Sequence, residues 1–184
     1  MNKKSLRFFP WLVVLMGSFG VLVGYSTETG ASTSYERETL RDIPAIVLNP
    51  INFTSTPTGL DKALPLEELR KEVEMEMRKA GVPLLPNDSM SSLDEFPHLQ
   101  IQGAVSQITT NYYAYTILIQ LHQEATLGKK AGQRSLVVTW SEGTLSTGDI
   151  QKFQDRVMLL ARLFIDDYLS VNPQTAQAWP LRWN

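Results

Sequence analysis

Residues 112–127, YYAYTILIQLHQEATL, form the longest and most regular alternation of apolar and polar side chains in this chain of 184 residues. Apart from Gln123, every second residue is apolar, which is the pattern of a half-buried strand. The apolar positions are Tyr113, Tyr115, Ile117, Ile119, Leu121, Ala125 and Leu127. A helical stripe can also be drawn through Ala114, Ile117, Leu118, Leu121 and Ala125. The tyrosines, isoleucines and threonines favour a pleated strand, so the stretch predicts the centre of a sheet.

The length of this strand predicts an irregularity. At about 3.3 Å per residue the stretch would extend roughly 50 Å, whereas most strands are roughly 17–20 Å long. We therefore expect a bend or a bulge, or one end that projects past the neighbouring strands.

Two further alternating segments flank the central stretch. Residues 98–108 (HLQIQGAVSQI) precede it across a short turn, and residues 135–145 (SLVVTWSEGTL) follow a basic loop at 128–134. In the second segment strict alternation places three apolar side chains on one face, namely Leu136, Val138 and Trp140. Three consecutive strands with short connections predict an antiparallel meander.

Two shorter strands are expected earlier in the chain. Residues 43–51 (IPAIVLNPI) are apolar, and Pro44 and Pro50 restrict this segment to the edge of a sheet. Residues 82–85 form a second apolar run, which can pair with the first in a parallel crossover. The composition of residues 52–63 and 87–97 indicates loops.

Two segments have the periodicity of amphipathic helices. The first starts at Pro65 and ends at Gly81, a residue suited to a left-handed cap. The second covers residues 149–171, with Thr147 or Asp149 as its N-cap. Their apolar stripes are Leu66, Leu69, Val73, Met77 and Ala80 in the first, and Ile150, Phe153, Val157, Leu160, Phe164, Tyr168 and Val171 in the second.

The order of these elements predicts the fold class. We expect an α+β two-layer sandwich with a mixed sheet of about five strands, in β-α-β-β-β-β-α order, and two helices on one face.

The two ends of the chain differ from this domain. Residues 1–26 combine a basic start with an apolar run, which predicts a cleaved signal peptide; the alternative is a membrane anchor formed by residues 8–25. Residues 27–40 are polar and aperiodic, which predicts a disordered spacer. The α/β domain is expected at 41–173, followed by a tryptophan-containing tail at 174–184. The expected location is extracytoplasmic, most simply periplasmic, with inner-membrane anchoring as the alternative.

Composition excludes several kinds of chemistry. The chain has no cysteine, so it has no disulfide, thiolate nucleophile or lipid-bearing cysteine. Its formal net charge is -2, which disfavours binding to nucleic acid. The basic loop lacks the spacing of a phosphate-binding loop, and no GxSxG motif is present. We predict no cofactor.

One set of side chains has the chemistry of a metal site. His122 and Glu124 share the polar face of the central stretch, and His98 begins the preceding strand. If they met, two imidazoles and a carboxylate could bind zinc and activate water for hydrolysis. A solvated strand face explains the same pattern, so we predict no metal site and no catalytic residue. Core packing is likewise the expected role of Trp140, and Asp166 and Asp167 diverge on their helix.

A possible partner-binding cluster lies in the tail. Trp179, Leu181 and Trp183 are apolar residues near the end of the chain, and tryptophan is a common interface anchor. They either fold back on the sheet or dock on a partner.

The element order resembles two groups of bacterial envelope modules. Residues 64–81 (LPLEELRKEVEMEMRKAG), the three meander strands and the closing helix up to YLSVNP have the pattern of the lipopolysaccharide-assembly lipoprotein. They are also similar to the amino-terminal domain of the Tol-Pal protein B. The likeness covers residues 43–173, although the lipidation cysteine of the lipoprotein is absent.

This resemblance implies a non-catalytic binding or assembly module of the cell envelope. Its expected partner is an envelope protein or an amphipathic ligand, and contact with the membrane is expected only through an uncleaved amino-terminal segment. A soluble carrier of an amphipathic ligand is the alternative, followed by a metal-dependent hydrolase.

Overall fold

The predicted central strand is confirmed. β4 (Tyr112–Thr126) lies between β3 (His98–Thr109) and β5 (Arg134–Gly148) and is antiparallel to both. The computed structural model describes residues 32–56, 64–85, 96–126 and 134–173. Within them the sheet is mixed and five-stranded, and β1 (Val47–Leu48) and β2 (Asn52–Thr56) both run parallel to β3. The predicted fold class is therefore confirmed.

The first predicted strand differs from the expectation in its extent. Residues 43–51 contain only the two-residue β1, and pairing resumes at β2, in a segment expected to be a loop. The backbone N–H of Asn49 still donates to the Leu99 carbonyl at 3.0 Å, but Pro50 has no N–H to donate. The proline interrupts the ladder, and the strand continues beyond it.

The predicted strand at 82–85 is reduced to one parallel bridge between Ile46 and Leu84. The Ile46 N–H donates to the Pro83 carbonyl at 2.9 Å, and the Leu85 N–H donates to the Ile46 carbonyl at 3.0 Å. The neighbouring Val47 pairs with β3 on the opposite side, so this part of the chain has a partner on both sides. The expectation that residues 43–51 form an edge strand is therefore wrong at this point.

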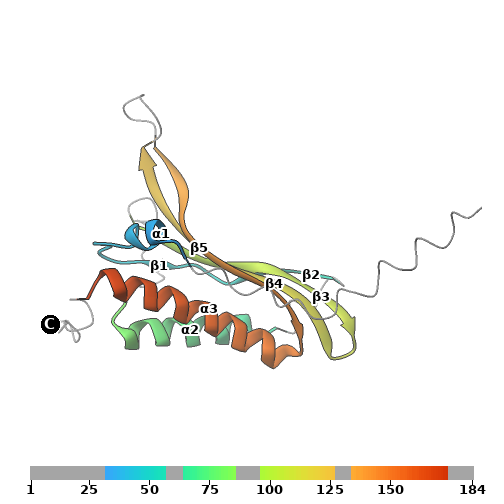
Figure 1. The fold of residues 1–184 in the computed structure, drawn as a ribbon. Coiled ribbons are helices and arrows are strands. Elements are labelled where there is room, and N and C mark those ends of the chain that lie inside the picture. The colour runs from blue at the N-terminus through green and yellow to red at the C-terminus, as the bar shows by residue number, and fades with distance from the viewer. Residues whose placement is uncertain (1–31, 57–63, 86–95, 127–133, 174–184) are drawn as a thin grey trace, which may run out of the picture.

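Two long helices form the second layer on one face of the sheet (Figure 1). α2 (Leu66–Ala80) ends at Gly81, whose φ of 90° is the left-handed cap that the sequence predicts. α3 (Ile150–Val171) begins at Asp149, whose side chain accepts a 2.9 Å hydrogen bond from the Lys152 N–H. Of the two predicted caps, Asp149 is the one used.

The space between the layers is filled with apolar side chains. Trp140 of β5 packs edge-on against Phe164 of α3, with ring centroids 4.9 Å apart. Phe153 lies in the same way between Phe53 and Tyr115, at 5.0 and 5.5 Å. Trp140 therefore belongs to the core, as the sequence predicts.

The irregularity was predicted for the central strand, and the structure places a bulge in its partner, β5. Leu121 pairs with Trp140, but the next residue of β4, His122, pairs with Val138, so Thr139 is the extra residue. Across this bulge the alternation changes phase. Leu136 and Val138 consequently lie on the opposite face from Trp140 and are 55% and 45% exposed, whereas Trp140 is fully buried. The expectation of one common face is therefore wrong.

Beyond the bulge the β4–β5 hairpin leaves the sheet as a projecting arm, formed by residues 122–126 and 134–138 (Figure 1). It rises away from the layer of α2 and α3. One of the predicted alternatives, a strand end that projects past its neighbours, is thus present together with the bulge.

Part of the predicted disordered spacer is ordered. α1 (Ser34–Glu38) has a complete capping box formed by Thr33 and Glu36. It contacts both α3 and β5, and Leu40 after it is fully buried. The polar composition of residues 32–40 concealed this one apolar anchor, so the expectation of disorder is wrong for them. Residues 27–31 lie outside the described residues.

The leader and the tail also lie outside the described residues, so the predicted signal peptide at 1–26 and the segment 174–184 have no structural account. Among the helices that are described, none combines the length and the apolar character needed to cross a bilayer.

Candidate binding surface

The face of the sheet opposite α2 and α3 is the candidate functional surface, and we call it the open face. It consists of the outward side chains of β2 to β5. In its middle a row of amides crosses two strands: the Gln100 amide donates to Gln102 at 3.0 Å, and the Gln102 amide donates to Gln120 at 3.1 Å. These uncharged groups satisfy one another and leave the face without a net charge there.

A hollow of about 510 Å³ lies beside this row. Gly143 forms part of its floor, because a Cβ at this position would already lie 3.0 Å from the end of the Leu118 side chain. The hollow is lined by uncharged residues only: Asn52, Thr54, Gln102, Gly103, Thr116, Ile117, Leu118, Gly143, Thr144 and Leu145. A smaller hollow of about 220 Å³ shares Thr54, Thr116 and Leu145 with it.

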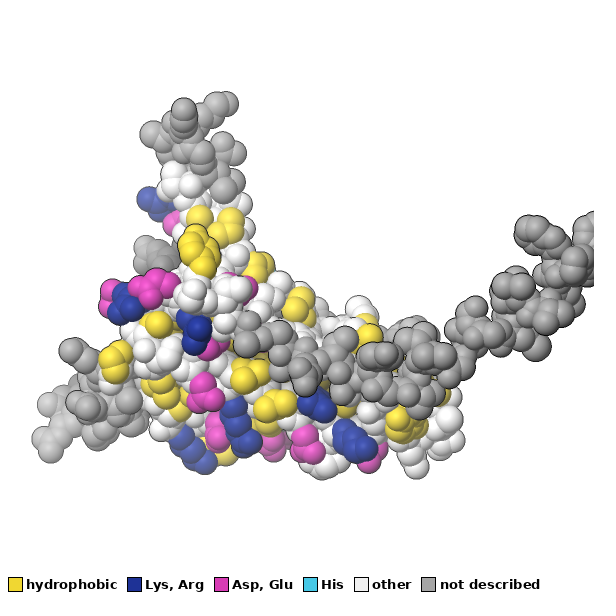
Figure 2. Space-filling view, in the orientation of Figure 1, with side chains coloured by type: hydrophobic (Ala, Val, Ile, Leu, Met, Phe, Trp, Pro, Cys, Tyr) yellow, Lys and Arg dark blue, Asp and Glu magenta, His cyan; other side chains and the backbone are white. Residues whose placement is uncertain are grey.

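Exposed apolar side chains continue this surface onto the projecting arm. Leu145 borders the hollow and is 51% exposed, and Leu136 and Val138 lie on the same face further along β5. Apolar side chains are visible along the arm in Figure 2. Apart from the mutually paired Glu124 and Arg134 on the arm, the hollow and the arm offer apolar and hydroxyl-bearing groups, which suit a neutral or apolar contact surface more than an ionic one.

The structure brings the two predicted histidines together. His98 and His122 are directly opposite each other in the β3–β4 ladder. His98 is buried, and its Nδ1 lies 3.2 Å from the side-chain oxygen of Asn49. Nε2 of His122 is also buried, and no hydrogen-bond partner for it exists among the described residues.

The third predicted ligand does not join them. Glu124 forms an ion pair with Arg134 at 3.1 Å on the arm, where both side chains are exposed. Within the described ranges no three histidine, aspartate or glutamate side chains are grouped closely enough to hold a metal ion. Two imidazoles alone do not provide the three or four protein ligands that zinc sites use.

A polar cluster lies on the side of the sheet that the helices cover, next to Ser32, where the described part of the chain begins. The Trp140 indole N–H donates to Asp167 at 2.9 Å, and the Ser32 hydroxyl donates to the same carboxylate oxygen. Asp166, the neighbour of Asp167, is exposed, so the two acids diverge as the sequence predicts. The cluster attaches the segment before α1 to both layers.

Glu142 belongs to the same cluster and is only 5% exposed. Burial raises the pKa of its carboxyl group, and the negative charges of Asp167 and Glu36 raise it further. The nearby backbone N–H groups of Ser32 and Gly143 lower the pKa in part. Glu142 is two residues from Trp140, so the strand alternation already placed a carboxylate on the core side, a signal that was missed.

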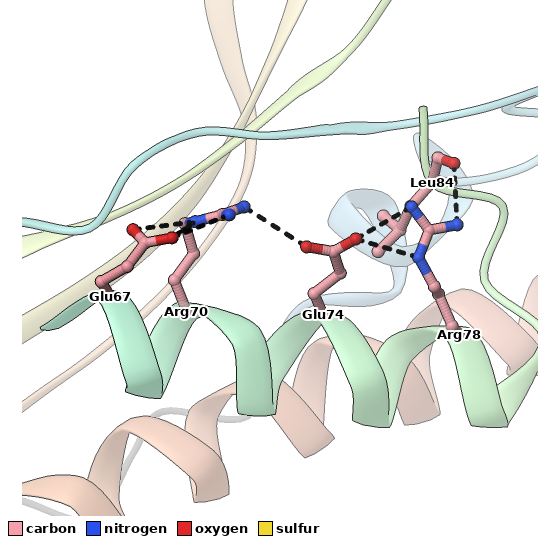
Figure 3. Close-up of polar contacts among 5 residues, drawn as sticks. All are labelled: Glu67, Arg70, Glu74, Arg78 and Leu84. Carbon is pink, nitrogen blue, oxygen red and sulfur yellow. Dashed lines mark hydrogen bonds and ion pairs between the residues drawn. The ribbon is translucent and has the colours of Figure 1, made fainter. Parts of the chain in front are cut away.

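On the helix layer, charged side chains form a continuous row along α2 (Figure 3). Arg70 bonds to Glu67 and Glu74 at 3.1 and 3.3 Å, and Arg78 bonds to Glu74 at 3.0 Å. Arg78 also donates to the Leu84 carbonyl at 3.2 Å, which fixes the segment after the helix. These charges are mutually paired, so the row stabilises α2 and holds the segment at Leu84, which bridges Ile46, against the helix.

The predicted partner-binding residues Trp179, Leu181 and Trp183 lie outside the described residues.

Comparison with known proteins adds no relative: no protein-family model matches the sequence, and no curated protein matches it either.

Proposed function

We propose that this chain is a non-catalytic binding or assembly module that works outside the cytoplasm, in a bacterial cell envelope, and that it binds a protein partner or an amphipathic ligand on its open face. The observation that carries this proposal is the uncharged hollow of about 510 Å³ on the face that α2 and α3 leave uncovered. The leader and the resemblance to envelope modules support the location.

The geometry of the hollow favours binding over catalysis. Its lining contains amides, hydroxyls, glycines and aliphatic groups, none of which is an acid, a base or a histidine. Such groups orient a ligand through hydrogen bonds and apolar contact, whereas proton transfer needs a positioned titratable side chain.

If the protein is instead a soluble carrier of an amphipathic ligand, the structure restricts where that ligand can bind. A ligand enclosed between sheet and helices would need the interlayer space, which Trp140, Phe153 and Phe164 fill. A carried amphipathic ligand would therefore lie on the open face as well, with its apolar part against Leu118 and Leu145.

Site-specific photocross-linking tests the proposal. Thr116 is exposed and lines the hollow, so a benzoylphenylalanine at this position should give a cross-linked product in intact cells. Met75, which is 50% exposed on α2, is the matched control and should give none. A protein partner shifts the band on a denaturing gel, whereas a ligand adds a small mass to the intact protein. Equal yields at both positions, or a product containing only a second copy of this chain, would contradict the proposal.

A further inference from the structure

Another hollow, of about 500 Å³, lies at the junction where β5 ends and α3 begins (Figure 1). Ser146 lines it from the strand, and Lys152, Arg156 and Arg162 line it from the helix. Asp155 is the only acid among the described residues of this lining, so three formal positive charges stand against one negative charge. The hollow therefore differs in chemistry from the uncharged hollow of the open face.

The hydroxyl of Tyr115 reaches this hollow from inside the fold. Tyr115 is only 1% exposed, its ring packs edge-on against Phe153, and its partner in the ladder is Ser146. Burial raises the pKa of the hydroxyl, whereas the Ser146 side chain and the positive charge of Arg156 lower it in part. The hydroxyl nevertheless forms no hydrogen bond of normal geometry with any described residue. A buried hydroxyl usually has a partner, so this one is a donor in need of an acceptor.

Two cations beside this hydroxyl also lack a partner. Lys152 and Arg156 are four residues apart on α3, where like charges repel, and neither forms an ion pair within the described ranges. Lys152 is the third residue of α3, where the helix dipole opposes a positive charge. Its stem lies against Gly148, because a Cβ on this glycine would be 2.7 Å from Cδ of Lys152. Arg162 is different, since it pairs with Glu76 at 3.4 Å.

The acids at this junction are engaged elsewhere. Asp149 accepts the backbone N–H of Lys152 as the N-cap, and Asp155 accepts the amide of Gln151 at 3.0 Å. Their negative charges still act on Tyr115, whose pKa they raise after the larger effect of burial. Among the ion pairs of the described residues, however, neither acid is joined to a cation of the hollow. Positive charge at the junction is thus left without a counterion.

We propose that this hollow binds a phosphoryl group, carried by a small phosphate ester or by a lipid headgroup, between Tyr115, Lys152 and Arg156. A phosphate oxygen would accept the Tyr115 hydroxyl, and the guanidinium and ammonium groups would donate charge-assisted hydrogen bonds to the others. A phosphate monoester carries about 1.5 to 2 negative charges at pH 7, which matches two unpaired cations better than a carboxylate does. The start of α3 adds its own attraction for an anion. The site does not depend on the proposed function of the open face.

An NMR titration with inorganic phosphate tests the site in the full-length protein. Amide signals of Ser146 and Lys152 should shift and saturate, and sodium acetate at equal ionic strength should not reproduce these shifts. Arg156→Gln should weaken phosphate binding by about tenfold or more, because a hydrogen bond between charged groups is lost. Lys71→Gln is the matched control, since it removes the same charge from an exposed position on α2, and it should bind as the unmodified protein does.

Tyr115→Phe separates a binding role from a structural one. The substitution keeps the ring against Phe153 and removes only the hydroxyl. Phosphate binding should weaken by about threefold or more, because one hydrogen bond is lost. Without phosphate the melting temperature should stay the same or rise, because a buried donor without a partner has been removed. A melting temperature that falls in the absence of phosphate would show that the fold already satisfies the hydroxyl, and would overturn the proposal.

Flotation with vesicles distinguishes the two sources of the phosphoryl group. Vesicles of phosphatidylcholine with and without phosphatidic acid offer the same surface with and without a phosphate monoester. If the group belongs to a lipid, phosphatidic acid should increase vesicle binding of the unmodified protein and of Lys71→Gln, but not of Arg156→Gln. Saturable binding of inorganic phosphate without this increase assigns the site to a small phosphate ester. Equal phosphate affinity of Arg156→Gln and Lys71→Gln, or equal shifts with acetate, would contradict a phosphoryl site.

Discussion

The indole nitrogen of Trp140 on β5 donates a 2.9 Å hydrogen bond to Asp167 near the end of α3. The same carboxylate oxygen accepts the hydroxyl of Ser32, which precedes α1. One carboxylate thus connects the sheet, the long helix and the amino-terminal segment. It also satisfies the polar atom of the largest fully buried side chain in the core.

Replacement of Asp167 by alanine is expected to destabilise the protein by about 1–3 kcal/mol. The substitution leaves the buried indole N–H without a partner, and that penalty exceeds the net value of an ordinary hydrogen bond. The free energy of unfolding can be measured by urea denaturation followed by circular dichroism. Asp166→Ala is the matched control, because Asp166 is exposed, and its change should stay within about 0.5 kcal/mol. Equal effects of the two substitutions would contradict the role of Asp167.

Glu142 is expected to make stability depend on pH. Because its pKa is raised in the folded protein, the carboxyl group keeps its proton there at pH values at which the unfolded chain has lost it. The folded state then binds more protons, so the free energy of unfolding falls as the pH rises from 4.5, the ordinary pKa of a glutamate, through the raised pKa. The destabilisation is complete above that pKa and disappears below 4.5.

Glu142→Gln should remove the pH-dependent destabilisation that ionisation of Glu142 causes, because glutamine does not titrate. Its side-chain oxygen can still face the N–H groups of Ser32 and Gly143. We expect the variant to gain stability relative to the unmodified protein as the pH rises, and the two curves to converge in acid. Urea midpoints from about pH 4 to pH 8 measure the difference. A difference that is constant over this range would show that the carboxyl group titrates normally.

Gly103 and Gly143 are both strand glycines, but substitution should affect them very differently. A Cβ on Gly103 would overlap the backbone carbonyl of Thr116 and lie 2.7 Å from Cε1 of Phe53, so Gly103→Ala is expected to cost about 3 kcal/mol or more. A Cβ on Gly143 would meet the flexible end of Leu118 at 3.0 Å and the Ile117 carbonyl oxygen at 3.1 Å, contacts that small shifts can relieve, so Gly143→Ala should cost less, about 1 kcal/mol. Thermal melting of the two variants compares them, and the reverse order would contradict this packing.

Elemental analysis of the purified protein should find no stoichiometric zinc. His98 and His122 are opposite each other, but Glu124 is paired with Arg134, so the described residues offer only two ligands together. His122→Ala should change the free energy of unfolding by less than about 1 kcal/mol. One zinc ion per chain that is lost in this variant would favour the hydrolase alternative instead.

The predicted export and cleavage of the leader can be tested on the full-length protein. Expression in a bacterium with the leader intact should give an extracytoplasmic protein that begins near Thr27, which intact mass spectrometry measures. Cleavage would be contradicted by a full-length species that resists carbonate extraction, and residues 8–25 would then act as an anchor.

The elements with strong periodicity were predictable from sequence because local rules determine them. β3, β4 and α3 have long, regular apolar patterns. Gly81 and Asp149 are residue types that are strongly preferred at the C-cap and the N-cap of a helix, which is where the structure has them. The fold class follows from these elements alone, because their apolar faces can be covered together only in two layers.

The features that sequence did not predict depend on contacts between distant segments. β2 is short and polar, and only its pairing with β3 makes it a strand. Leu40 is a single apolar residue in a polar segment, and its burial depends on α3 and the core. The hollow of the open face arises where Gly143 and Leu118 face each other across two strands, a juxtaposition that needs the register of the sheet.

Thr139 has a consequence for how this surface can change over generations. Insertion of one residue between Leu121 and His122 would give Thr139 a partner in β4 and restore unbroken alternation in both strands, and Leu136 and Val138 would then turn to the side of Trp140. Which face of the arm carries these apolar side chains is therefore decided by the difference in residue number between the two paired strands. An in-frame insertion of a single codon in β4 would exchange the two faces of the arm, whereas deletion of Thr139 would leave them as they are.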